Sequence, residues 1–233
     1  MPQTSNQAAS LLRWYVRFTR FGTTHLVRLQ ENEMSCGPSC AMMVHCRMNR
    51  LTNVTDGMAT EQSMIANVKQ TVPGRANWNA ATEGLTGDEV AALLNSFNIG
   101  TWQSQDVGQT GVTDALIDSA SLFNLSSVPI IAGVSGPGVG HWVMIDYMIK
   151  NPFSGSYWAL ICDTWDSYVH VQSMSKGQAV DYNFSTPIGS WSFPPIWPDR
   201  TDSGTLRFDG SIVRCTGMPV LSRLGKVFLG NGV

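Results

Sequence analysis

The chain has 233 residues, of which 43% are hydrophobic and 14% are charged, and its formal net charge is −2. That length and apolar content can bury a substantial core, so we expect one domain that spans residues 1–233. The charges are nearly balanced and form no basic stripe, which argues against nucleic acid as a partner.

The cysteines and the apolar segments indicate the compartment. The five cysteines are an odd number in a chain too long to need disulfide staples, so we expect reduced thiols and a cytoplasmic site of action. Residues 1–7 are polar and the stretch 11–18 is interrupted by arginines, which is typical of an amphipathic first element and not of a signal core. The most apolar window, Val128–Met148, contains a proline, several glycines, His141 and Asp146. We therefore expect no transmembrane span and no membrane partner.

The first part of the chain, about 1–126, has mainly helical patterns. Apolar residues recur at helical spacing in four segments, and the third of these opens with a capping box, Thr86-Gly87-Asp88-Glu89. The expected helices begin at Cys36, span Thr60–Gln70, run from Thr86 to about Phe97, and span Val112–Asn124.

The second part, about 127–233, changes to the short apolar runs of strands. A run with three prolines, Trp191–Pro198, is expected to form an ordered surface loop. The expected strands are Val128–Val134, His141–Ile149 and Tyr157–Asp163, with edge strands at Tyr168–Gln172 and Ser211–Cys215. The predicted fold class is therefore α+β, with a helical part packed on an antiparallel sheet.

Cys36 has the surroundings of a nucleophile. A helix N-terminus lowers the pKa of a thiol because its unpaired N–H groups and the helix dipole favour the thiolate. Such a nucleophile needs a histidine as acid and base, and a polar group that orients the histidine. His141 follows a glycine-rich turn and opens an apolar strand, and Asp163 ends the next strand. If the two strands form a hairpin, these side chains come level at its open end.

A third requirement is a donor for the oxyanion that forms when sulfur attacks a carbonyl. Gln30, in the segment that enters the helix, can supply a side-chain N–H beside the backbone N–H of Cys36. Asp163 has two rivals as the orienting group. Asp146 points to the opposite face of its strand, whereas Asp166 lies past the end of the next strand and can serve if that strand runs longer.

These residues resemble papain-like cysteine peptidases, whose order along the chain is Gln, Cys, His, and then Asn or Asp. The string Cys36-Gly37-Pro38-Ser39-Cys40 looks most like the bacterial double-glycine leader peptidases that process bacteriocins, and their stand-alone relatives. His141-Trp142-Val143-Met144-Ile145 and Cys162-Asp163-Thr164-Trp165 are similar to that group's histidine and aspartate strands. The resemblance implies a papain-like fold with Gln30 as oxyanion donor, Cys36 as nucleophile, His141 as acid/base and Asp163 as orienting group.

Cysteines and histidines near one another also permit a metal site. Cys36, Cys40, His45 and Cys46 lie close in sequence, but zinc sites generally need a second ligand pair at suitable spacing and none is evident. We therefore expect no metal and no cofactor. Cys40, one turn beyond Cys36, is expected to pack in the core.

The leading functional hypothesis is a cysteine endopeptidase that acts on protein or peptide substrates. The resemblance implies cleavage after a Gly-Gly or other small pair, in a bacterial toxin or effector exported without a signal peptide, with a cognate inhibitor or immunity protein as a further partner. Three alternatives remain open: a leader-peptide processing peptidase, a transglutaminase-like acyltransferase that uses the same triad, and a catalytically dead binding module.

Overall fold

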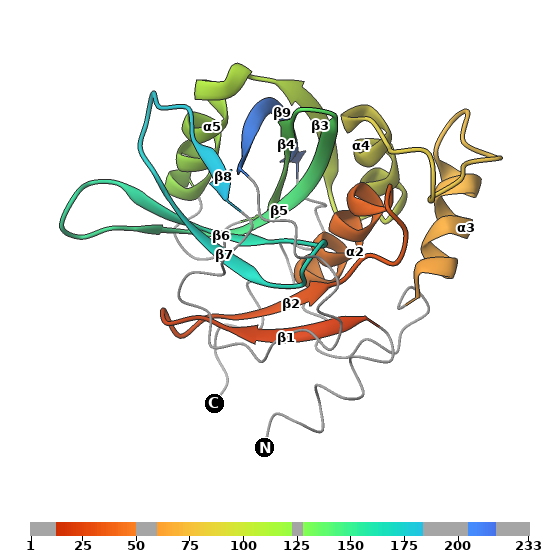
Figure 1. Cartoon of the computed structure of the whole chain (residues 1–233), viewed down its shortest axis with the longest axis horizontal. Coiled ribbons are helices and arrows are strands. Elements are labelled where there is room, and N and C mark those ends of the chain that lie inside the picture. Colours follow the sequence, from red (N-terminus) through yellow and green to blue (C-terminus); the bar gives the residue numbers. More distant parts are fainter. Residues whose placement is uncertain (1–12, 50–59, 123–127, 184–204, 218–233) are drawn as a thin grey trace.

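A computed structural model describes residues 13–49, 60–122, 128–183 and 205–217. Its elements mix four helices with strands from both halves of the chain (Figure 1). The helices are α2 (Cys36–Met48), α3 (Glu61–Thr71), α4 (Gly87–Ser96) and α5 (Gly108–Leu122). The strands are β1 (Trp14–Phe18), β2 (Thr24–Arg28), β3 (Thr101–Asp106), β4 (Ile130–Gly136), β5 (Val139–Lys150), β6 (Tyr157–Cys162), β7 (Val169–Met174), β8 (Asp181–Asn183) and β9 (Thr205–Gly217).

A seven-stranded antiparallel sheet organises the described part of the chain. Its order is β3-β9-β4-β5-β6-β7, and β8 pairs with β9 off this path. β1 and β2 form a separate two-stranded hairpin that lies below the α2 helix in Figure 1. The α+β class with a large antiparallel sheet is therefore confirmed.

The sheet separates two apolar clusters because successive strand side chains point to opposite faces. On one face, Ile131, Met144 and Leu160 pack with side chains of α2, α3 and α4. On the other face, Val143 and Ile161 pack with side chains of α5 and of β8. Figure 1 shows the corresponding arrangement, with α5 apart from the other helices. The alternation predicted for the β5 and β6 strands is thus present.

The four predicted helices are present with shifted ends. Thr60 caps α3 by accepting a bond from the N–H of Ser63. Thr86 and Glu89 form the predicted capping box at the start of α4. The fourth helix begins at Gly108, four residues before its predicted start. The extra turn, Gly108-Gln109-Thr110-Gly111, has no apolar stripe that could have revealed it.

Three strands lie in the half that was expected to be mainly helical. The amphipathic first element is the β1 strand, which pairs with β2, and β3 follows α4. β3 is largely polar, and it is a strand because every one of its residues pairs with the β9 strand more than a hundred residues later. The sequence pattern within β3 gives no indication of a strand partner so far along the chain.

β9 corrects the expectation of an edge strand at 211–215. It is thirteen residues long and lies between β3 and β4, so both of its edges are paired over much of its length. The surface loop predicted at Trp191–Pro198 lies outside the described residues. Within the described ranges, every helix is too short or too polar to cross a bilayer.

Candidate active site

Cys36 is the first residue of α2 and is only 6% exposed. The following Gly37 is required by close packing: a Cβ there would lie 2.9 Å from Val90 Cγ2 and 3.2 Å from Trp142 Cδ1. Because a larger residue would clash, glycine lets the start of α2 approach α4 and the β5 strand that carries His141. The glycine of the motif therefore has a packing role that brings the thiol to the sheet.

His141 and Asp163 meet from neighbouring strands. His141 is the third residue of β5, and Asp163 directly follows the last residue of β6. The imidazole Nε2–H donates to Asp163 Oδ1 at 2.8 Å, and both side chains are fully buried. The backbone N–H of Asp163 donates to the carbonyl of Tyr168, which fixes the turn between β6 and β7. The hairpin arrangement expected from the sequence thus brings the two side chains together.

Because Nε2 of His141 bonds to Asp163, Nδ1 is the ring nitrogen left for the thiol. His141 Nδ1 is buried and makes no hydrogen bond within ordinary distance and angle limits. Nonetheless the Cys36 thiol is near enough for a hydrogen bond and for charge to act on both groups. A thiol and an imidazole at this range form a contact that is looser than an ordinary hydrogen bond.

The electrostatics favour an ion pair between the thiol and the imidazole. Burial alone would raise the pKa of Cys36, but the hydrogen bond and charge of His141, with backbone hydrogen bonds from Trp142 and Gly37, hold that pKa below its usual value. Burial would likewise lower the pKa of His141, and the Asp163 carboxylate outweighs it and raises the pKa to about 9. The pKa of Asp163 lies well below its usual range despite burial, because of the charge and hydrogen bond of His141.

Two further residues, Trp165 and Tyr182, hold the imidazole and the carboxylate. The ring of Trp165 stacks on that of His141, with centroids 3.7 Å apart and planes 14° apart. The backbone N–H of Trp165 also donates to Asp163 Oδ1 at 2.7 Å. The hydroxyl of Tyr182, from β8, donates to Asp163 Oδ2 at 2.5 Å. Trp165 stands in the quoted motif two residues after Asp163, whereas no local pattern indicates Tyr182.

Gln30 lies beside this group, but its amide is engaged elsewhere. Its Nε2 donates to the carbonyls of Asn32 at 2.9 Å and Glu33 at 3.0 Å. Its Oε1 accepts from the hydroxyl of Thr164 at 2.7 Å, and its backbone N–H donates to the carbonyl of the same residue. Gln30 therefore ties the segment before Cys36 to the residue after Asp163, and its role as an oxyanion donor stays a prediction.

Asp166 and Asp146, the two alternative candidates for the acid that orients His141, form hydrogen bonds with other residues. Asp166 Oδ2 accepts from His170 Nε2 at 2.7 Å, and its Oδ1 accepts from the N–H of Tyr168. Asp146 bonds to His25 at 2.6 Å and to Arg47 at 2.7 Å. Of the three carboxylates, Asp163 is the one that bonds to His141.

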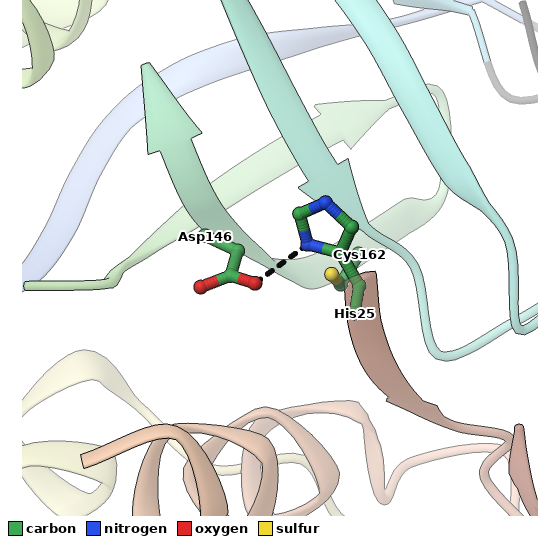
Figure 2. Close-up of side chains that lie close together, drawn as sticks. All are labelled: His25, Asp146 and Cys162. Atoms are coloured by element: carbon green, nitrogen blue, oxygen red, sulfur yellow. Dashed lines mark hydrogen bonds and ion pairs between the residues drawn. The ribbon is translucent and has the colours of Figure 1, made fainter. Parts of the chain in front are cut away.

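Asp146, His25 and Cys162 form a second buried group with Cys/His/Asp composition (Figure 2). Figure 2 shows His25 reaching from its strand to Asp146, with the sulfur of Cys162 beside the ring. Both nitrogens of His25 are hydrogen-bonded, one to Asp146 and the other to Thr23. Burial raises the pKa of the Cys162 thiol well above its usual value, which disfavours a thiolate. We interpret this group as a structural contact between the hairpin and the large sheet.

The other candidate metal ligands are also engaged. Within the described residues, a further group of ligand atoms within 4.8 Å of one another belongs to Asp163, Asp166 and His170, and it consists of the hydrogen-bonded side chains above. Cys40 is buried and donates to the carbonyl of Trp142 at 3.3 Å, and burial raises its pKa well above the usual value. All five cysteines are free thiols.

Comparison with models of known protein families gives no match, and no curated protein is significantly similar in sequence. The chemistry of this site must therefore be argued from its own geometry.

Proposed function

We propose that the chain is a papain-like cysteine endopeptidase. The observation that carries the proposal is a buried imidazole bonded through Nε2 to Asp163, with its other nitrogen available to a thiol at a helix N-terminus. A nucleophile, an acid/base and an orienting acid in series are the parts that thiol acyl transfer requires. The lowered pKa of Cys36 and the raised pKa of His141 support the same assignment.

In the proposed reaction, the Cys36 thiolate attacks a peptide carbonyl and forms a carbon–sulfur bond. The carbonyl electron pair moves to oxygen, and the backbone N–H of Cys36, in the unpaired first turn of α2, is placed to stabilise it. His141 then donates its proton to the leaving amine as the carbon–nitrogen bond breaks. Water attacks the thioester and His141 takes a proton from that water. The carbon–sulfur bond then breaks, the acid product leaves, and the Cys36 thiolate beside the His141 imidazolium restores the starting state.

Gln30 enters this scheme as a second oxyanion donor only if one of its N–H groups leaves a loop carbonyl. Substrate that binds beside residues 30–35 would displace this N–H from the carbonyl. The alternative role, which needs no movement, is to hold the segment before Cys36 against Thr164. Gln30→Glu retains the acceptor for Thr164 but also loses the bonds to the carbonyls of Asn32 and Glu33. A donor role therefore predicts a fall in kcat while the rate of Cys36 labelling stays at the wild-type value, whereas a structural role predicts that both fall.

The substrate preference and setting belong to the same proposal. We propose cleavage after a small-residue pair such as Gly-Gly, in a bacterial toxin or effector. Expression of the wild-type chain and of Cys36→Ala in bacteria tests the setting. Growth inhibition by the wild type alone supports toxicity, whereas equal growth of both strains favours a processing peptidase.

The chemistry itself is tested with a peptide electrophile that reacts with thiolates. The wild type should be labelled at Cys36, and Cys36→Ala should lose the label. Cys215→Ala is the matched control because Cys215 is half-buried on β9, its pKa is raised mainly by burial, and it has no role in the scheme. Mapping of new protein N-termini after exposure to the wild type and to Cys36→Ala would then identify the cleavage site. New termini that arise equally with both proteins would overturn the proposal.

A further inference from the structure

Asp163 has a second carboxylate oxygen that does not touch the histidine. Oδ1 accepts from His141 Nε2 and from the N–H of Trp165, while Oδ2 accepts from the hydroxyl of Tyr182 at 2.5 Å. Asp163 and Tyr182 are both fully buried. A carboxylate held through one oxygen can rotate about the bond to its Cβ, whereas a bond to each oxygen fixes the plane of the group.

Tyr182 itself is held by packing that does not involve its hydroxyl. Its residue pairs with Leu206 in the β8–β9 ladder. The ring meets His170 edge-on, with centroids 5.6 Å apart, and meets Phe208 at 6.1 Å. Replacement by phenylalanine should therefore preserve the position of the ring and remove only the hydrogen bond.

We propose that Tyr182 is a positioning residue, whose hydroxyl fixes the Asp163 carboxylate in the orientation that points His141 at Cys36. This inference rests on the proposed peptidase function. Tyr182 acts through Asp163 and touches neither the thiol nor the site of bond cleavage. For histidines that ligate a metal, removal of a group behind the ring typically costs about 10–100-fold in affinity or activity, and we expect an effect at the lower end of that range here.

The charged surroundings keep the tyrosine a donor. The other titratable groups near this carboxylate are His141 on β5, His170 on β7, Asp166 in the turn before β7, Cys40 on α2 and Cys162 on β6. Burial and the nearby Asp163 and Asp166 raise the pKa of Tyr182 well above its usual value. Its hydroxyl thus stays protonated across the working range, so any pH dependence of its effect must come through the groups that it positions.

The test compares Tyr182→Phe with Tyr15→Phe. Tyr15 is also buried, but its hydroxyl has no hydrogen-bond partner among the described residues. Removal of that hydroxyl in Tyr15→Phe is therefore a matched control. The readout is the rate at which iodoacetamide alkylates Cys36, followed by mass spectrometry. At about pH 6 we expect Tyr182→Phe to react roughly tenfold more slowly than the wild type, because the imidazolium no longer stabilises the thiolate. At about pH 10 the two rates should agree within about twofold, because His141 is neutral in both proteins above its pKa of about 9 and its charge no longer distinguishes them.

An Asp163→Ala background shows whether the tyrosine acts through the carboxylate. There Tyr182→Phe should change the rate at about pH 6 by less than about twofold, because the group it positions is gone. A similar loss at both pH values, or an undiminished loss in the Asp163→Ala background, would indicate a general structural role and overturn the inference. Rapid alkylation of Cys36 at about pH 6 in both the wild type and Tyr182→Phe would also overturn the inference. A slow wild type, with the reactivity of an ordinary thiol, would instead overturn the proposed function.

Discussion

At the scale of single residues, the site depends on charges that stabilise one another in a buried environment. The thiol, imidazole and carboxylate of Cys36, His141 and Asp163 are each disfavoured as ions by burial. They are nonetheless stabilised as a series of alternating charge, because each ion lies next to one of opposite sign. Loss of the His141 charge should therefore destabilise both the Cys36 thiolate and the Asp163 carboxylate.

The first prediction concerns pH. The pKa of Cys36 is lowered and that of His141 is raised to about 9, so the thiolate–imidazolium pair forms as pH rises through the first value and is lost as pH rises through the second. We expect alkylation of Cys36 to persist well below about pH 8.5, the usual pKa of a cysteine. Peptide hydrolysis should fall above about pH 9 because the acid that protonates the amine is lost.

The measurement is a pH profile of alkylation for the wild type and for His141→Ala. In the variant, the rate should follow the titration of an ordinary or more basic thiol. If the two profiles coincide, the imidazole does not stabilise the thiolate.

The second prediction separates the two acids that follow β6. Asp163→Asn should reduce kcat/KM by about tenfold or more, because the imidazole loses its charged acceptor. Asp166→Asn is the matched control, since Asp166 bonds to His170 and not to His141. Its effect should stay below about threefold. Kinetics on a cleaved peptide would check this, with circular dichroism to show that both variants fold, and a larger loss for Asp166→Asn would reverse the assignment.

At the scale of elements, the start of α3 holds the segment that leads into α2. The carboxylate of Glu61, the first residue of α3, is buried and accepts from the backbone N–H groups of Glu31 and Asn32 at 2.6 and 3.0 Å. The guanidinium of Arg28 lies 3.7 Å from it. Gln30 holds the carbonyls of the same segment. Side chains from two directions thus fix the approach to Cys36.

The third prediction follows from this contact. Glu61→Gln replaces one acceptor oxygen by a donor that faces a backbone N–H, so we expect the free energy of unfolding to fall by about 2 kcal/mol. Glu83→Gln is the control because its carboxylate is 48% exposed and bonds only at the surface, where about 1 kcal/mol or less is expected. Urea unfolding of both variants measures the difference. Equal midpoints would show that Glu61 contributes no more than a surface acid.

Local sequence predicted the elements whose partners are close along the chain. The α4 capping box and the apolar β4 run are complete within a few residues. β3 was not predicted because it is polar and pairs with β9 more than a hundred residues later. β1 and β2 were not predicted although they pair with each other, because charged side chains, Arg17 and Arg28, occupy buried positions and obscure the alternation of a strand. Cys36, His141 and Asp163 could be proposed as candidate-site residues because motif and chain order single them out. Tyr182, on a three-residue strand, has no such motif.

At the scale of the whole molecule, one buried carboxylate joins three elements. Asp146 on β5 accepts from Arg47 on α2 and bonds to His25 on β2. It lies at a register shift between β5 and β6, where the ladder skips from Ile145 to Tyr147. The bulge turns the carboxylate away from the ladder and toward the hairpin, so the large sheet, the Cys36 helix and the β1–β2 hairpin share one anchor.

The fourth prediction is that removal of this charge loosens the hairpin specifically. Asp146→Asn leaves Arg47 and His25 without their carboxylate, and breaking a buried pair costs about 3 kcal/mol or more of unfolding free energy. Asp181→Asn is the control, since its pair with Arg207 is 54% exposed on each side and should contribute less than about 1 kcal/mol. Hydrogen exchange should then quicken in 14–18 and 24–28 more than in β4 and β6, because the hairpin's other contacts are fewer than those of a central strand. A uniform increase over all strands would mean that the carboxylate stabilises the fold as a whole and that the hairpin is not a separate unit.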